Sequence, residues 1–211
     1  MHSHSLSTEP SNQSGQPDRW ALWVDGAGGF LLITSLSATI GGPASDDEAM
    51  IAVQADLRRR EALITRSNGQ YQVQAVDGRV APSASASGNR ESASPQAVVS
   101  LRPEDSFVLG DGVPFKFRLP NPLSGSARLT VDRRYRFRSH VDAILLIDDT
   151  LVIGPSADCH IQVPHAAGKL VLMPKENAWQ IKPAVAGTQW QNLQCGTRWH
   201  DFDLSMTLEK L

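Results

Sequence analysis

The stretch Ala62-Leu-Ile-Thr-Arg-Ser-Asn-Gly-Gln-Tyr-Gln-Val-Gln-Ala75 decides the fold class. Its second half alternates glutamine with Tyr71, Val73 and Ala75, which is the two-residue period of a strand with one wet face and one buried face. Asn68-Gly69 in its middle is the dipeptide most favoured in a tight turn between two strands. The stretch therefore predicts a β-hairpin.

Short apolar or alternating runs separated by Gly, Pro and Asp continue on both sides of this hairpin, and no segment shows a sustained helical period with caps. Many short strands about ten residues apart predict an all-β sandwich. The predicted strands of the first half are Trp20–Val24, Phe30–Ile33, Ala38–Ile40, Met50–Val53, Ala62–Thr65, Gln70–Val73, Ala97–Ser100, Ser106–Leu109 and Pro114–Arg118.

Composition changes mark the predicted organisation. Residues 1–18 hold little apolar surface and predict a disordered tail, and the serine-rich stretch from Val80 to Pro95 predicts a long polar loop. Asn121-Pro-Leu-Ser-Gly-Ser126 has the chemistry of a linker, after which a second strand series begins. We expect one β-sandwich over residues 19–122 and a second, shorter one over residues 127–211.

Two comparisons across the linker indicate an internal repeat. Thr39-Ile-Gly-Gly-Pro-Ala-Ser-Asp46 resembles Val152-Ile-Gly-Pro-Ser-Ala-Asp158, and the stretch from Ala62 to Val73 resembles the stretch from Leu170 to Ile181 without a gap. Order and spacing agree in both comparisons, whereas short hairpins that look alike by chance are the alternative.

The overall composition excludes several classes of protein. The chain has 211 residues, 41% hydrophobic and 20% charged, with a net charge of −2, which is ordinary globular usage without the basic field that non-specific nucleic-acid binding needs. Its two cysteines favour a reducing compartment. The longest aliphatic run, Ala143–Ile147, is far shorter than the roughly 18 residues of a membrane helix. With no secretory signal at Met1, we expect a cytoplasmic protein.

The order of features in the first half resembles the forkhead-associated (FHA) family. These features are a strand ending in Ile40-Gly41, a polar turn, the arginine-rich approach to Ala62, and the hairpin at Asn68-Gly69. Leu101–Gly110 followed by Pro114–Arg118 is similar to the closing strands of that family. The resemblance implies a sandwich of eleven strands whose loops at one end recognise phosphothreonine peptides, and the second half resembles a shorter, degraded copy.

The phosphate-binding pattern of the family is absent. Gly42 stands where the family has an arginine, Arg58 at the position of a serine, and Glu61 at the position of a histidine. The corresponding positions of the second half hold Pro155, Ala166 and Lys169. The family's Asn-Gly turn has only Asp77-Gly78 or Asn89 as weak matches. Losing two donors worth about 1.5 to 3 kcal/mol each would weaken a micromolar site to roughly 0.1 mM.

We therefore expect a non-enzymatic protein-interaction or scaffolding module with a protein partner, such as a phosphoprotein or a component of a kinase pathway. One alternative is a phosphopeptide-binding signalling adaptor that uses Arg58, Arg59 and Arg60 in place of the missing residues. Another is an oligomerisation scaffold. Neither a membrane nor a cofactor is implied, and the charge balance argues against nucleic acid.

Two arginine clusters are candidate binding residues. Arg58-Arg59-Arg60 can fork onto phosphate or carboxylate oxygens, although neighbouring acids such as Asp56 make a solvated turn the alternative. In Arg133-Arg-Tyr-Arg-Phe-Arg138, a strand would project Arg134, Arg136 and Arg138 from one face. That face would suit an acidic protein surface or, less well, a nucleic acid, and an edge strand protected by its charges is the alternative.

Metal and catalytic sites are not predicted. The spacing of Cys159, His160, His165, Cys195 and His200 lacks a paired ligand motif, so we expect a buried Cys159 thiol and histidines on the surface. No nucleophile elbow, Walker-type loop or His-Glu-x-x-His helix is present. The tryptophans are expected to pack within or between the sandwiches.

Overall fold

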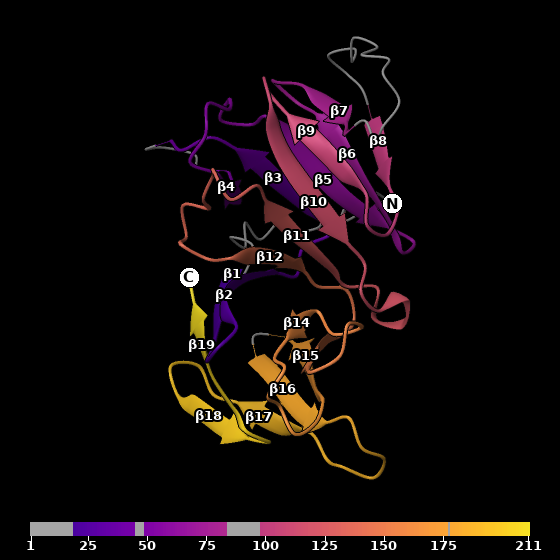
Figure 1. Cartoon of the computed structure of the whole chain (residues 1–211), viewed down its shortest axis with the longest axis vertical. Helices are drawn as coiled ribbons and strands as arrows, with labels where there is room; N and C mark the ends of the chain where they lie inside the picture. The colour runs from indigo at the N-terminus through magenta and orange to yellow at the C-terminus, as the bar shows by residue number, and fades with distance from the viewer. Residues whose placement is uncertain (1–18, 45–48, 84–97, 177) are drawn as a thin grey trace, which may run out of the picture.

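The computed structural model describes residues 19–44, 49–83, 98–176 and 178–211, and in those ranges the chain is built from strands and one short 3-10 turn (Figure 1). The predicted all-β class and the sandwich are confirmed. The predicted tail over residues 1–18, most of the predicted polar loop, and Asn89 lie outside the described residues. Within the described ranges, no helix is long and apolar enough to span a membrane.

The first half contains β1 (Arg19–Val24), β2 (Gly28–Ile33), β3 (Ser37–Gly41), β4 (Ile51–Ala52), β5 (Ala62–Ser67), β6 (Gln70–Ala75), β7 (Val80–Pro82), β8 (Val98–Leu101), β9 (Ser106–Leu109) and β10 (Val113–Arg118). After the 3-10 turn η1 (Pro122–Ser124), the second half contains β11 (Ala127–Val131), β12 (Ala143–Leu146), β13 (Leu151–Gly154), β14 (Ile161–Gln162), β15 (Leu170–Lys175), β16 (Ala178–Pro183), β17 (Gln191–Leu193), β18 (Arg198–Asp201) and β19 (Leu204–Lys210).

The hairpin that decides the fold class is formed by β5 and β6. Asn68 and Gly69 both have positive φ, 51° and 72°, as a tight turn between twisted strands requires. Side chains of β6 alternate between exposed glutamines and a buried face made by Tyr71, Val73 and Ala75. Every strand predicted between Trp20 and Arg118 is present with small differences at its ends, and the structure adds β7 where a loop was predicted.

Two five-stranded sheets share one strand order. The first runs β4-β3-β5-β6-β8 and the second runs β14-β13-β15-β16-β17. In each sheet the outer pair is parallel, with Ile40 opposite Ile51 in one and Ile153 opposite Ile161 in the other, and the remaining pairs are antiparallel. The first two stretches compared in the sequence begin at Thr39 in β3 and at Val152 in β13, so they start at corresponding places in the two sheets.

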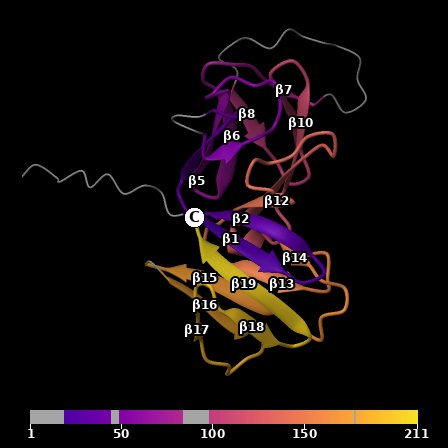
Figure 2. The same cartoon turned by 90° about the vertical axis from the view of Figure 1, so that its left-hand side faces the viewer.

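A nine-stranded sheet, β18-β19-β1-β2-β12-β11-β10-β9-β7, joins the two halves. Its centre is a parallel pair, β2 beside β12, with Phe30 opposite Ala143 and Ile33 opposite Leu146. On one side β1 pairs with β19, the last strand of the second half, and the two lie side by side in Figure 2. On the other side β11 pairs with β10, the last strand of the first half. The first hairpin of each half thus completes the sheet of the other half.

Two hydrophobic cores lie on opposite faces of this shared sheet. Leu31 and Ile33 of β2 contribute to the first core, whereas Phe30 and Leu32 contribute to the second. Strand β12 divides in the same way. This explains why β2 and β12 are continuous apolar runs, since strands buried on both faces have no exposed side to keep polar. The residues expected to separate two domains form η1, which connects β10 and β11, neighbours in one sheet.

Polar groups at the junction of the halves are also buried. The Tyr71 hydroxyl donates to the carbonyl oxygen of Gly125 (2.7 Å), and Arg66 forms an ion pair with Asp148 (3.3 Å). His160 is fully buried, so its prediction as a surface histidine is wrong. Its Nδ1 accepts from the Val152 N–H (3.0 Å), and its Nε2 lies 3.0 Å from the Ser126 carbonyl oxygen. These bonds offset the cost of burying a polar ring.

Candidate functional site

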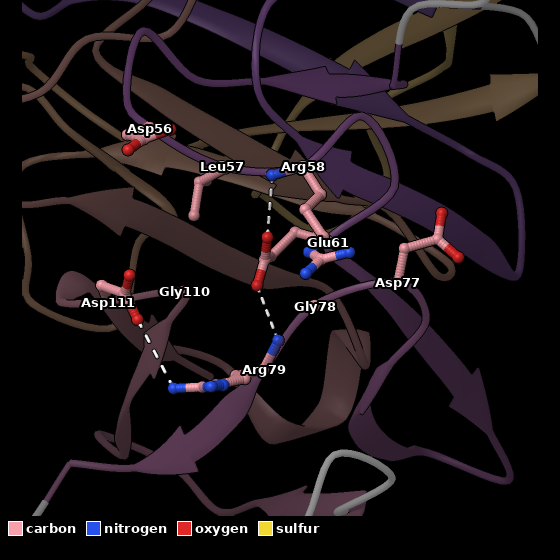
Figure 3. Close-up of a pocket in the computed structure, with 9 residues that line it drawn as sticks. All are labelled: Asp56, Leu57, Arg58, Glu61, Asp77, Gly78, Arg79, Gly110 and Asp111. Atoms are coloured by element: carbon pink, nitrogen blue, oxygen red, sulfur yellow. Dashed lines mark hydrogen bonds and ion pairs between the residues drawn. The ribbon is translucent and has the colours of Figure 1, made fainter.

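Three loops of the first half meet around a surface hollow of about 410 Å³ (Figure 3). They are the loop between β4 and β5, which carries Asp56–Glu61, the β6–β7 loop with Asp77-Gly78-Arg79, and the β9–β10 turn at Gly110-Asp111. These loops form the loop end of the first sandwich, and one of them carries Arg58 and Glu61, which the sequence analysis singled out. We therefore take the hollow as the first candidate site.

Glu61 is the central group of this hollow. Its side chain is only 2% exposed, and its two carboxylate oxygens accept hydrogen bonds from the backbone N–H groups of Arg58 (2.8 Å) and Arg79 (2.6 Å). The carboxylate thus ties the β4–β5 loop to the β6–β7 loop, as Figure 3 shows. Gly78 allows this approach, because a Cβ there would lie 1.8 Å from a carboxylate oxygen of Glu61.

The rim of the hollow carries more acidic than basic groups. Asp56, Asp77 and Asp111 are exposed around it, and the basic side chains are those of Arg58 and Arg79. Arg79 already forms an exposed ion pair with Asp111 (3.6 Å). With Glu61 beneath them, these charges disfavour an incoming anion.

The predicted cluster Arg58-Arg59-Arg60 is exposed but does not converge on the hollow. Arg58 is the one member of this cluster that lines it. The carbonyl oxygen of Arg58 accepts from the Gly42 N–H (2.9 Å), so the arginine loop packs directly on the end of β3. A Cβ at Gly42 would lie 2.3 Å from the Leu57 carbonyl oxygen, which leaves no room for the arginine that the family pattern has at this position.

The second predicted cluster belongs to the connection between β11 and β12. The strand expected over residues 133–138 is not formed, because Phe137 makes only an isolated bridge with Val53 and the rest is turns. Exposure does not alternate as it would on a strand, because Arg133 is exposed together with Arg134, Arg136 and Arg138. Phe137 is buried in the first core. Arg134 donates to Asp132 Oδ1 (2.9 Å) and thereby lowers the pKa of that carboxyl group.

The second arginine segment is held beside β4. The Gln54 N–H donates to the Arg136 carbonyl oxygen (2.7 Å), and the Arg138 N–H donates to the Ala52 carbonyl oxygen (2.9 Å). The Arg138 guanidinium also donates to the Ala44 carbonyl oxygen (2.6 Å). In Figure 1 this connection runs beside β4 before it returns to β12. The segment therefore covers the open edge of β4, which would otherwise present unpaired backbone groups.

The corresponding end of the second half has a different polar arrangement. Lys169, which precedes β15 as Glu61 precedes β5, is paired with Asp158, its Nζ lying 2.7 Å from Oδ2. The lysine lowers the pKa of Asp158 to about 2. Ala166 is buried and Pro155 is exposed. Neither side chain can donate a hydrogen bond to a phosphate.

In the part of the chain that the structure describes, the cysteines and histidines do not gather into a ligand set. Cys159 is buried, as predicted, and Cys195 is exposed, and both thiols are free. Across the described ranges, no group of three or more histidine, cysteine, aspartate or glutamate side chains could hold a metal ion. Trp20 and Trp179 are buried in the second core, whereas Trp23 is partly exposed and donates to Glu209 (2.8 Å).

Sequence reasoning missed the role of Glu61, which it treated only as a departure from the family pattern. A glutamate directly before an alternating strand, with a glycine at position 78, was the available signal, but nothing in the sequence pairs the two loops. No family model, curated protein or solved structure matches the chain.

Proposed function

We propose that this chain is a non-enzymatic, cytoplasmic protein-interaction module of the FHA type whose loop end does not recognise phosphothreonine. The position of Glu61 is the observation that argues against phosphothreonine recognition. Its carboxylate occupies one backbone N–H group from each of two loops, that of Arg58 and that of Arg79.

An internal carboxylate at this place opposes an external phosphate for two reasons. These two backbone donors are already used, so a phosphate that bound to them would have to displace a buried hydrogen-bonded group. A charge held about 4 Å from the carboxylate would also be repelled by about 4 kcal/mol at an effective dielectric constant near 20. Affinity in the micromolar range, about −8 kcal/mol, would not survive these costs.

The interaction role is supported by how the fold presents its surface. Buried side chains from the strands fill both cores. At the loop end, Glu61 accepts from the Arg79 N–H, and the Arg79 side chain pairs with Asp111. Loops on such a rigid scaffold can vary without loss of the fold, which suits partner binding. The partner is expected to be a protein.

The decisive experiment is affinity capture with the full chain from an extract divided into untreated and phosphatase-treated halves. A partner retained equally from both halves is the expected result. No retained partner, or one lost after phosphatase treatment, would overturn the proposal.

Fluorescence anisotropy with a phosphothreonine peptide library and its unphosphorylated counterpart tests the phosphate-dependent alternative directly. We expect no preference for phosphate. A preference that disappears in the variant Arg58→Ala, Arg59→Ala, Arg60→Ala would mean that the arginines have rebuilt a phosphate site.

A further inference from the structure

A second hollow lies on the side of the first sandwich, in the connection between β11 and β12. Its volume is about 360 Å³, and it is lined by Val131, Arg133, Tyr135, Arg136, Phe137, His140, Val141 and Asp142. It shares no residue with the loop-end hollow around Glu61.

The charged groups of this hollow differ from those at the loop end. Arg133 and Arg136 are exposed, and neither forms an ion pair with another residue of the described ranges. The carboxylate of Asp142 accepts from the Gly29 N–H (2.8 Å). Arg134 is not among the lining residues and is engaged with Asp132. Two guanidinium groups therefore share the hollow with one carboxylate that has a structural role.

The backbone that carries the two arginines is fixed before any ligand arrives. Phe137 is 1% exposed in the first core, and the Arg136 carbonyl oxygen is held by Gln54. The Tyr135 N–H donates to the Asp132 carbonyl oxygen (2.9 Å), and the His140 N–H donates to that of Phe137 (3.0 Å). His140 has φ 57°, a conformation that a non-glycine residue adopts only where its surroundings impose it. Binding would therefore have to order the two arginine side chains but not the backbone that carries them, which lowers the entropic cost.

We propose that this hollow is the docking site for an acidic segment of the partner protein, with a side-chain carboxylate held between Arg133 and Arg136. Guanidinium groups match the planar, two-oxygen geometry of a carboxylate. The hollow offers two positive charges and one negative charge, which complements a single carboxylate better than a phosphate of charge near −2. The half-buried ring of Tyr135 provides an apolar wall for the methylene groups of a glutamate.

This inference rests on the proposed function and names the partner's chemistry. The test is fluorescence anisotropy at low salt with the full chain and a labelled peptide of alternating glutamate and glycine. The same peptide with glutamine replacing glutamate is the neutral control. We expect the acidic peptide to bind, the neutral peptide not to bind, and Arg133→Gln with Arg136→Gln to weaken binding about tenfold or more.

The matched control is Arg59→Gln with Arg60→Gln, which removes the same charge from exposed arginines that line neither hollow. It should leave binding within about twofold of the unmodified chain. Equal weakening by both double variants, or by neither, would overturn the site. Tighter binding of a phosphoserine peptide or a single-stranded oligonucleotide, dependent on Arg133 and Arg136, would overturn the assignment to a carboxylate.

Failure here can be distinguished from failure of the proposed function. A partner captured regardless of phosphatase treatment, and equally by the chain with Arg133→Gln and Arg136→Gln, would refute this docking site alone. Absence of any captured partner would refute the proposed function itself.

Discussion

Leu31 and Leu32 are neighbours in β2, yet their side chains lie in two different hydrophobic cores. Both are almost completely buried, at 2% and 0% exposure. Because one strand serves both cores, disruption of either core removes a wall of the other. The halves should therefore unfold together.

We expect Leu31→Ala and Leu32→Ala each to lower the free energy of unfolding by about 2 to 5 kcal/mol. Both should shift the same transition, whether it is followed by far-ultraviolet circular dichroism or by the fluorescence of Trp20 and Trp179, which lie in the second core. If Leu31→Ala moved the circular dichroism transition and left the fluorescence transition in place, the halves would be independent units.

Neither half should fold by itself. A fragment covering residues 19–122 carries β1, whose partner β19 belongs to the other fragment, and it lacks β11 beside β10. Fragments 19–122 and 127–211 prepared separately should show no cooperative thermal transition, and their mixture should recover one. The thermal transition of the intact chain is the reference. Two fragments that each melt cooperatively would contradict the prediction that each half needs the first hairpin of the other.

Removal of the Glu61 carboxylate should loosen the loop end. Glu61→Ala leaves the N–H groups of Arg58 and Arg79 without their acceptor, which costs about 1 to 3 kcal/mol of unfolding free energy in a chemical denaturation experiment. Asp77→Asn, a change at an exposed carboxylate of the same rim, is the control and should stay within about 0.5 kcal/mol. Similar losses in both variants would show that the loops respond to charge and not to these two hydrogen bonds.

The free energy of unfolding should decrease as the pH is lowered and His160 becomes protonated. Burial lowers the pKa of His160 below its ordinary value of 6.5, so the unfolded chain takes up the proton first as the pH falls. This contribution is therefore fully present above about pH 6.5 and is lost as the pH falls through the lowered value, by up to about 1.4 kcal/mol per pH unit. The urea midpoint measured between about pH 7.5 and about pH 5.5 reports it.

His160→Gln removes the titrating ring and should flatten this pH dependence even where it lowers the midpoint itself. His165→Gln, at an exposed histidine, should preserve the slope. An unchanged slope in His160→Gln would assign the effect to other groups. Asp158 does not interfere, because its pKa of about 2 places its loss of stabilisation well below this range.

The local sequence pattern predicted where the strands lie, but it did not predict which strands pair with each other in the sheets. The alternation in β6 and the turn at Asn68-Gly69 identify a hairpin because both signals arise within a few residues. The apolar runs of β2 and β12 predict burial on both faces, but they do not indicate that these strands pair with each other in parallel. That pairing joins residues more than a hundred positions apart, such as Phe30 and Ala143.

The site residues show the same limit. The arginines around Phe137 predict a strand with one cationic face, but the segment is irregular and Arg133 is exposed as well as Arg134. The burial of the Phe137 ring against the first core is a tertiary contact that the local pattern does not indicate. The burial of His160 depends on acceptors and donors at Ser126 and Val152, which come together only in the folded chain. Glu61 looks like an ordinary surface charge until Arg79 is placed beside it.

The exchanged hairpins change what a chain of two sandwiches is free to lose. If two sandwiches are independent domains joined by a linker, one can accumulate substitutions or be deleted while the other still folds. Here β11 and β12 supply the wall of the first core, and β1 and β2 supply the wall of the second. A substitution in one half that disrupts these strands therefore removes packing from the core of the other half, so selection on either sandwich acts on both.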